Sequence, residues 1–208
     1  MPSTNTPDPQ MSFTTQQKQQ LLELAWQTIR LSVESGIKPR IDTTAYDATL
    51  QQHGACFVTI HSYPSNNAEK QLRGCIGTLK AYQPLVIDVI EHAYAAAMRD
   101  PRFPPINATE LNHLELDISV LTPEVPIECS SEEELLEQLT PFKDGLSIED
   151  GVNKATFLPN VWDQLPDKQD FLNHLRMKAG LTENHWSEQF KAYKYQTLMI
   201  TAENSSCR

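Results

Sequence analysis

The segment Leu72-Arg73-Gly74-Cys75-Ile76-Gly77 combines residue types that can do chemistry. The thiol of Cys75 stands two residues from the guanidinium of Arg73, and a cationic neighbour favours the thiolate that attacks carbon or binds a soft metal. Gly74 and Gly77 flank the thiol, and glycines interrupt a strand where it bulges or where another group approaches the backbone closely. The segment therefore predicts a nucleophilic or ligand-binding loop.

Two interpretations of Cys75 are open. In the functional one, Arg73 orients an anionic substrate or stabilises the thiolate, and the backbone N–H groups of Gly74 and Gly77 bind an anion. A base would then come from His61 or His92. In the structural one, the segment is a β-bulge in which Cys75 packs as a small hydrophobic residue, because free cysteine is among the most buried residue types.

A second segment, Asp100-Pro101-Arg102-Phe103-Pro104-Pro105, must be an extended and stiff loop, because a proline excludes helix for the residue before it. We expect it to line one groove with the segment 73–77 and to hold a small anion, a cofactor or a peptide. Asp100 and Arg102 would pair with each other or with Arg73. The structural alternative is that Asp100 accepts backbone N–H bonds while Phe103 fills the core.

Composition excludes several classes of function. The chain of 208 residues has a net charge of −10 and a pI near 5.0, which argues against a nucleic-acid or anionic membrane surface. The spacing Gly74-x-x-Gly77 also occurs in RNA-clamping loops, but those join two helices in a basic surround. The sequence contains no apolar run long enough to span a membrane. Four cysteines at irregular gaps predict no metal site and indicate reduced thiols in the cytoplasm.

The hydrophobic pattern predicts an α+β class with a largely antiparallel, twisted sheet, because helices and hairpins follow one another without a βαβ rhythm. We expect residues 1–12 to form a disordered lead, 13–200 a single domain, and 201–208 a flexible tail. Six glutamates between residues 124 and 137 have no neighbouring lysine or arginine and predict a solvated acidic face. Helices are expected at residues 15–34, 84–99, 131–139 and 167–179, and strands at 55–60, 71–79, 114–120, 146–148, 152–158 and 193–200.

Motifs along most of residues 15–200 resemble, in order, those of the AMMECR domain family. They are Leu72-Arg73-Gly74-Cys75-Ile76-Gly77, Pro84-Leu85, the run from Ala95 to Pro105, Ile118 to Pro123, Gly145-Leu146, Thr156 to Pro159, Lys178-Ala179-Gly180-Leu181 and Trp186. The hexapeptide is the most specific of these. A compact chain of this kind is similar to protein A of the AmmeMemoRadiSam gene sets, which also encode a Memo-like protein and a radical SAM protein.

The resemblance implies two unequal lobes around a barrel-like, mostly antiparallel sheet with flanking helices. It implies the Memo-like and radical SAM proteins as partners, and no settled activity or cofactor. Many relatives carry a basic-Gly-Thr-Phe-Leu-Pro-Gln motif where this chain has Lys154-Ala155-Thr156-Phe157-Leu158-Pro159-Asn160. Lys154 thus joins Arg73, Gly74, Gly77, Asp100 and Arg102 as a candidate ligand-binding residue beside Cys75.

Overall fold

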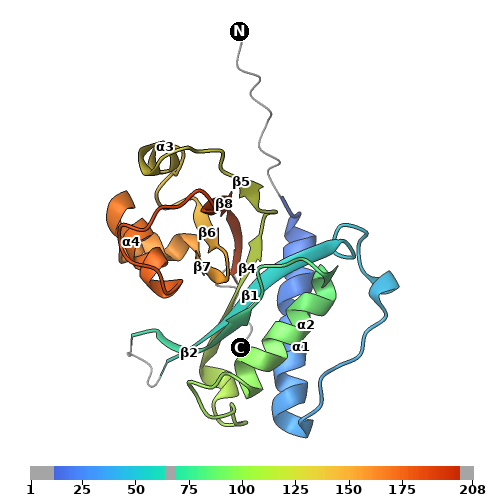
Figure 1. The fold of residues 1–208 in the computed structure, drawn as a ribbon. Helices are drawn as coiled ribbons and strands as arrows, with labels where there is room; N and C mark the ends of the chain where they lie inside the picture. Colours follow the sequence, from blue (N-terminus) through green and yellow to red (C-terminus); the bar gives the residue numbers. More distant parts are fainter. Residues whose placement is uncertain (1–11, 64–68, 202–208) are drawn as a thin grey trace. The chain divides into compact units, whose positions relative to one another are not determined.

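The computed structural model describes residues 12–63 and 69–201, which form two compact units (Figure 1). The first unit contains the chain up to Val120 and the segment from Leu198, and the second contains Leu121–Thr197. The predicted lead and tail lie outside the described residues, apart from Ser12 and from Thr201, which ends a strand. The tail cysteine, Cys207, is among the residues not described.

Helix α1 (Thr15–Ser35) begins and ends as its sequence predicts. The Thr14 side chain accepts the Gln17 N–H at 3.2 Å, and the Gln17 side chain accepts the Thr14 N–H at 2.9 Å. This reciprocal pair satisfies two backbone donors that the first turn leaves unpaired. Gly36 closes the helix with a φ of +69°, a conformation that costs glycine little.

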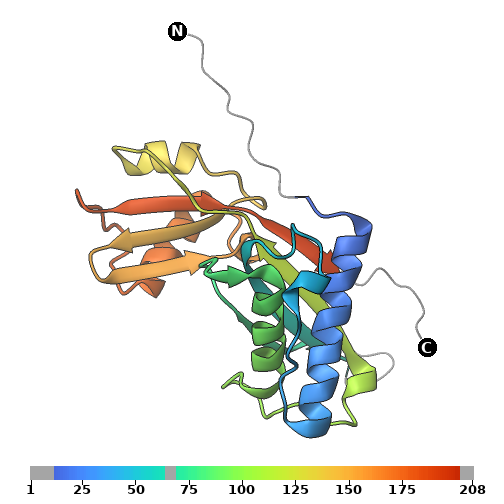
Figure 2. The same ribbon diagram turned by 90° about the vertical axis from the view of Figure 1, so that its right-hand side faces the viewer.

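The first unit pairs helices α1 and α2 (Leu85–Met98) over one face of a five-stranded sheet (Figures 1 and 2). The main path of the sheet is β2-β1-β4-β9, and β3 adds to β1. Alternate residues of β1 are buried in the core beneath the helices, and short 3₁₀ turns connect the elements. The bounds are β1 (His53–Ser62), β2 (Gln71–Gly77), β3 (Gln83–Pro84), β4 (Leu114–Leu121), β9 (Thr197–Thr201), and turns at Thr43–Ala45 and Leu111–His113.

The second unit has a four-stranded sheet of order β5-β8-β6-β7 and a core of its own. The predicted Asp-Gly hairpin is confirmed, because β6 and β7 pair antiparallel across Gly151, whose φ is +59°. The rings of Trp162 and Phe171 stack in the core with their centroids 3.7 Å apart. The bounds are β5 (Val125–Pro126), α3 (Glu132–Glu137), β6 (Gly145–Asp150), β7 (Asn153–Phe157), a 3₁₀ turn (Pro159–Asp163), α4 (Lys168–Lys178) and β8 (Lys191–Tyr195).

The last predicted strand, residues 193–200, is two strands in different sheets. Gln196 separates β8 from β9 and pairs with Thr122 instead. The Gln196 N–H donates to the Thr122 hydroxyl at 2.8 Å, and the Thr122 N–H donates to the Gln196 carbonyl at 2.9 Å. The residue types on both sides of Gln196 are typical of strands, so the sequence pattern alone does not reveal the break.

The α+β class is confirmed, and β1 with β2, β6 with β7 and β6 with β8 run antiparallel. The sheet architecture differs from the barrel-like sheet that the resemblance implied. The strands in the described part of the chain form two open sheets and close no barrel.

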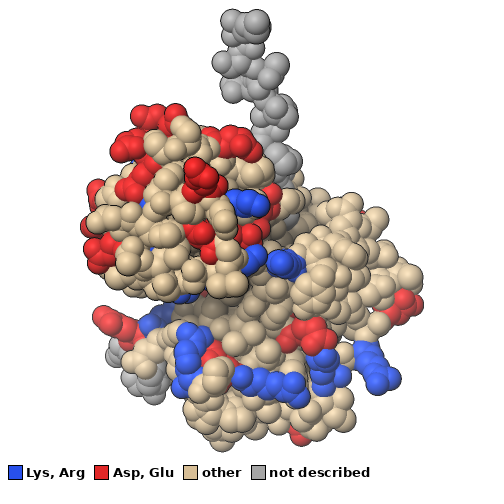
Figure 3. Space-filling model, viewed as in Figure 1, with Lys and Arg blue, Asp and Glu red and all other residues tan. Residues whose placement is uncertain are grey.

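Acidic side chains gather around α3, as the space-filling view shows (Figure 3). Most of the predicted glutamates there are exposed, which fits a solvated face. Glu132 differs, since it pairs at 2.6 Å with the fully buried guanidinium of Arg176 on α4. None of the described helices has the length and apolar character that crossing a membrane requires.

Candidate functional site

The hexapeptide lies on β2, and the strand bulges at Arg73. Ile60 of β1 pairs with Gly74, and the next residue, His61, pairs with Leu72, so Arg73 is the extra residue of β2. A bulge re-aims the side chain of the residue that it inserts. The irregularity that the two glycines predicted is therefore present, and it falls on the arginine.

Gly74 and Gly77 are explained by close packing. A Cβ on Gly74 would lie 2.2 Å from the backbone oxygen of Ala96 on α2, and one on Gly77 would lie 2.3 Å from the ring of Phe57. Neither glycine has a positive φ, whereas an anion-binding nest of backbone N–H groups uses that conformation. Their part in ligand binding stays a prediction.

Cys75 is half-buried and is held at three points. Its N–H donates to Asp100 Oδ2 at 2.9 Å, its carbonyl accepts from Arg102 Nη2 at 3.0 Å, and its sulfur accepts from the Thr59 hydroxyl at 3.2 Å. The expected meeting of the segments 73–77 and 100–105 thus takes place at the backbone of Cys75. Two long-range hydrogen bonds fix the backbone of Cys75, and its sulfur lies next to a polar group, the Thr59 hydroxyl.

Asp100 and Arg102 pair with each other. The Asp100 side chain is 1% exposed and accepts from Arg102 Nε at 2.9 Å and from Nη2 at 2.7 Å, whereas the Arg102 side chain is 52% exposed. These hydrogen bonds from Arg102, together with the N–H of Cys75, hold the pKa of Asp100 well below its usual range, against the opposite effect of burial. Asp100 is therefore ionised at neutral pH.

Arg73 pairs with a residue that sequence reasoning did not name. Its Nε donates to Glu110 Oε1 at 2.7 Å and its Nη2 to Oε2 at 3.2 Å. The guanidinium also lies 5.9 Å from the ring centroid of Phe103. Hydrogen bonds from Arg73 lower the pKa of Glu110. Arg73 is 9% exposed, and in the described part of the chain it pairs with Glu110 and not with Asp100, while its Nη1 is buried without a partner.

His61 and His92, the two candidate bases, lie on opposite faces of the sheet. Cys75 pairs with Thr59, and His61 follows Thr59 by two residues on β1, so these three side chains share the face away from the helices. His61 Nδ1 lies 3.3 Å from Asp117 Oδ2. Burial, with the nearby Lys70 charge, lowers the pKa of His61, which leaves its imidazole neutral at pH 7.

Lys154 lies in the second unit, on β7. Its amine donates to Glu149 Oε1 at 2.8 Å across the β6–β7 pair, and its side chain is 55% exposed. An exposed ion pair of this kind contributes little to stability. A role for Lys154 beside Cys75 stays a prediction.

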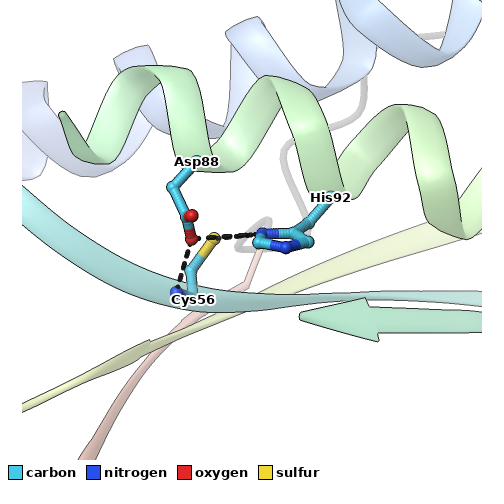
Figure 4. Close-up of side chains that lie close together, drawn as sticks. All are labelled: Cys56, Asp88 and His92. Carbon is cyan, nitrogen blue, oxygen red and sulfur yellow. Dashed lines mark hydrogen bonds and ion pairs between the residues drawn. The ribbon is translucent and has the colours of Figure 1, made fainter. Parts of the chain in front are cut away.

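A second cluster, which sequence reasoning missed, lies between β1 and α2 (Figure 4). Asp88 Oδ2 is 3.1 Å from His92 Nδ1, and Cys56 Sγ is 4.0 Å from the same nitrogen. Both Cys56 and Asp88 are fully buried. The available signal was the four-residue spacing of Asp88 and His92, which places them on one helix face. Cys56, 32 residues earlier, gave no signal.

The chain is similar to archaeal proteins of about its own length. Protein MJ0810 of Methanocaldococcus jannaschii is 36% identical over 163 residues, which cover 76% of this chain and 77% of that protein. Protein PH0010 of Pyrococcus horikoshii is 36% identical over 193 residues, 88% of each chain. The crystal structure of the uncharacterized protein PH0010 superimposes with a TM-score of 0.77, at 33% identity, and covers 90% of this chain and 92% of that one.

The AMMECR1 family model matches residues 22–200. This range contains the bulged hexapeptide, the Asp100–Arg102 pair and the cluster around Asp88. With more than half of the chain matched, and with relatives above 30% identity over most of their length, the chain belongs to the AMMECR1 family.

Proposed function

We propose that Cys75 is the group through which this protein contacts or reacts with its ligand. The observation that carries this proposal is that Asp100 and Arg102 fix the backbone of Cys75 from both sides, while its sulfur stays half-buried beside one hydroxyl. A functional group must be held in a fixed position to act, and long-range hydrogen bonds to its own peptide groups provide that.

Arg102 gives the proposed site its preference for anions. It uses Nε and Nη2 for Asp100 and for the Cys75 carbonyl, and half of its side chain is exposed. A carboxylate or phosphate that approached the exposed part of the guanidinium would lie next to Cys75, and arginine binds such groups well. The proposed ligand is therefore a small anionic molecule or an anionic group of a larger one.

His61 is the better of the two candidate bases for chemistry at Cys75. It shares a sheet face with Cys75, its imidazole is neutral, and Asp117 lies next to its Nδ1. His61 Nδ1 is buried and makes no hydrogen bond among the described residues, so Asp117, 3.3 Å away, supplies a nearby negative charge but does not fix the ring. His92 faces Cys56 instead, on the helix side of the sheet.

The second candidate function is a binding module without catalysis, and the glycines favour it. Because Ala96 and Phe57 leave no room for a Cβ at Gly74 and Gly77, the hexapeptide has a packing reason for its composition. In this version Cys75 contacts a ligand or partner but forms no bond with it. Both versions predict that the ligand lies on the Cys75 face of the first unit.

The setting of this function is part of the proposal. We propose the cytoplasm, which is supported by the free thiols of Cys56, Cys75 and Cys129. We also propose a pathway shared with a Memo-like protein and a radical SAM protein, a partnership suggested by the resemblance of the hexapeptide and the following motifs.

Co-expression of this chain with the Memo-like protein and the radical SAM protein, its two proposed partners, tests this proposal. We expect the chain to co-purify with at least one of them and to carry a new mass on the peptide that contains Cys75. Cys75→Ser should remove that mass, and Cys129→Ser, a half-buried cysteine of the second unit, should retain it. A modification that persists in Cys75→Ser would contradict a covalent role for Cys75. If neither the Memo-like nor the radical SAM protein bound the chain, the proposed partnership would be contradicted.

A further inference from the structure

The cluster of Cys56, Asp88 and His92 brings three kinds of metal-binding atom together in one place. Cys56 comes from β1, and Asp88 and His92 come from successive turns of α2, so a strand and a helix that pack on each other supply the donors (Figure 4). The sulfur, the ring nitrogen and the carboxylate oxygen all lie within 4.8 Å of one another. Sulfur, nitrogen and oxygen donors from Cys, His and Asp are those that bind zinc in proteins.

Hydrogen bonds through Asp88 join the three groups, because Asp88 bonds both to His92 Nδ1 and to the Cys56 side chain. The Nδ1 atom of His92 carries at most one proton, yet it faces both Asp88 Oδ2 at 3.1 Å and Cys56 Sγ at 4.0 Å. A catalytic triad is excluded, because there the thiol and the carboxylate would contact different nitrogens of the ring. A metal ion bound to all three groups would take the place of the protons that link them through Asp88.

The distances are close to those of a tetrahedral zinc site. Bonds of about 2.0–2.1 Å to nitrogen and oxygen and about 2.3 Å to sulfur place neighbouring donor atoms about 3.3–3.6 Å apart. The Asp88–His92 separation of 3.1 Å is slightly below that range, and the Cys56–His92 separation of 4.0 Å is slightly above it. Small rotations of the side chains would bring the three donors onto one ion.

The surroundings of Asp88 also favour a cation. Asp88 has no exposed surface, and in the described part of the chain its ion-pair partner is His92, which carries a charge only when protonated, and not a lysine or arginine. Its Oδ2 accepts the Cys56 N–H at 2.8 Å, and its Oδ1 accepts the Gln83 side-chain amide at 2.9 Å. Neutral donors of this kind orient a metal-binding carboxylate but do not neutralise its charge.

From these observations the geometry points to a divalent metal site at Cys56, Asp88 and His92, with donors suited to zinc. On binding, the Cys56 thiol loses its proton to solvent and the thiolate, the carboxylate and the neutral imidazole become the three protein ligands. The fourth position of a tetrahedral ion is left for water. His92, which is 8% exposed, is the part of the site nearest to solvent. This site is distinct from Cys75, which lies on the other face of the sheet.

Cobalt titration of the full chain tests the site. The protein carries Cys207→Ser, is freed of metal with a chelator, and is titrated with Co²⁺ while its absorption is recorded. We expect one Co²⁺ per chain, a thiolate-to-cobalt charge-transfer band and the intense visible bands of tetrahedral cobalt. Excess Zn²⁺ should remove these bands, because zinc exceeds cobalt in affinity for such sites.

Matched variants separate this site from other thiols. Cys56→Ser should abolish the charge-transfer band, Cys129→Ser should retain it, and Gln83→Ala should weaken Co²⁺ binding about 10- to 100-fold by releasing Asp88. Circular dichroism checks that each variant is folded. Should Cys56→Ser misfold, Gln83→Ala and His92→Gln still report on the site. Absence of a charge-transfer band at saturating Co²⁺, or an equal band in folded Cys56→Ser, would overturn the inference.

Discussion

Replacing Gly74 by alanine is expected to destabilise the first unit by about 3 kcal/mol or more and to lower its Tm by about 10 °C. The added Cβ would lie 2.2 Å from the backbone oxygen of Ala96, and a backbone atom cannot rotate away as a flexible side chain can. Helix α2 would have to move from β2, which would disturb the core beneath it. Thermal unfolding followed by circular dichroism measures the effect.

The matched control is Gly151→Ala at the turn between β6 and β7. A Cβ there meets nothing within 4 Å, and the φ of +59° makes the cost about 1 kcal/mol. A folded Gly74→Ala protein with an unchanged Tm would contradict the packing explanation. If that protein also failed to bind its ligand, Gly74 would have the ligand-contacting role that the sequence predicted.

Asp100→Asn is expected to cost about 2 kcal/mol at pH 7 and to loosen the backbone of Cys75. The carboxylate accepts from the Cys75 N–H and from two nitrogens of Arg102, and hydrogen bonds to a charged group are stronger than those to an amide. We expect a lower midpoint in urea, measured across a pH series.

The pH dependence of this cost has a definite sign. Because the folded protein holds the pKa of Asp100 well below the ordinary value of 3.8, the carboxylate stabilises the fold at every pH above that value. This stabilisation is lost as the pH falls through the depressed folded pKa. The wild type should therefore exceed Asp100→Asn in stability by a constant amount at pH 5–8, and the difference should shrink below pH 4.

Glu149→Gln is the control for Asp100→Asn. It removes the carboxylate of an ion pair with Lys154 whose side chains are 35% and 55% exposed, so the change should stay within about 0.5 kcal/mol at all pH values. An equal loss of stability in the two variants would contradict the conclusion that the buried Asp100 carboxylate holds the Cys75 backbone in place.

The local signals in the sequence predict most elements well. The capping box at Thr14 and the glycine at 36 place both ends of α1, and Asp150-Gly151 places the β6–β7 hairpin. These features depend on neighbours a few residues apart, so the sequence displays them directly. The break at Gln196 depends on Thr122, 74 residues earlier, and no local pattern reports it.

The candidate site divides in the same way. That Asp100 lies close to Cys75 could be expected because both segments carry recognisable motifs, and the structure brings them together. The pairing of Arg73 with Glu110 could not be expected, since Glu110 lies in an ordinary polar turn. The metal-binding cluster was hidden for a related reason. Cys56 on β1 comes close to Asp88 and His92 on α2 only when the helix packs on the strand.

Alkylation of the folded protein at neutral pH, with Cys207→Ser and peptide mapping over time, tests the role of Cys75 most directly. Burial and the Asp88 carboxylate raise the pKa of Cys56 well above its usual range, and burial with Glu134 and Glu128 nearby raises the pKa of Cys129. A raised pKa leaves less of the reactive thiolate at neutral pH. We predict that Cys75 is modified before both. A Cys75 that reacts only when the whole protein unfolds would contradict the account.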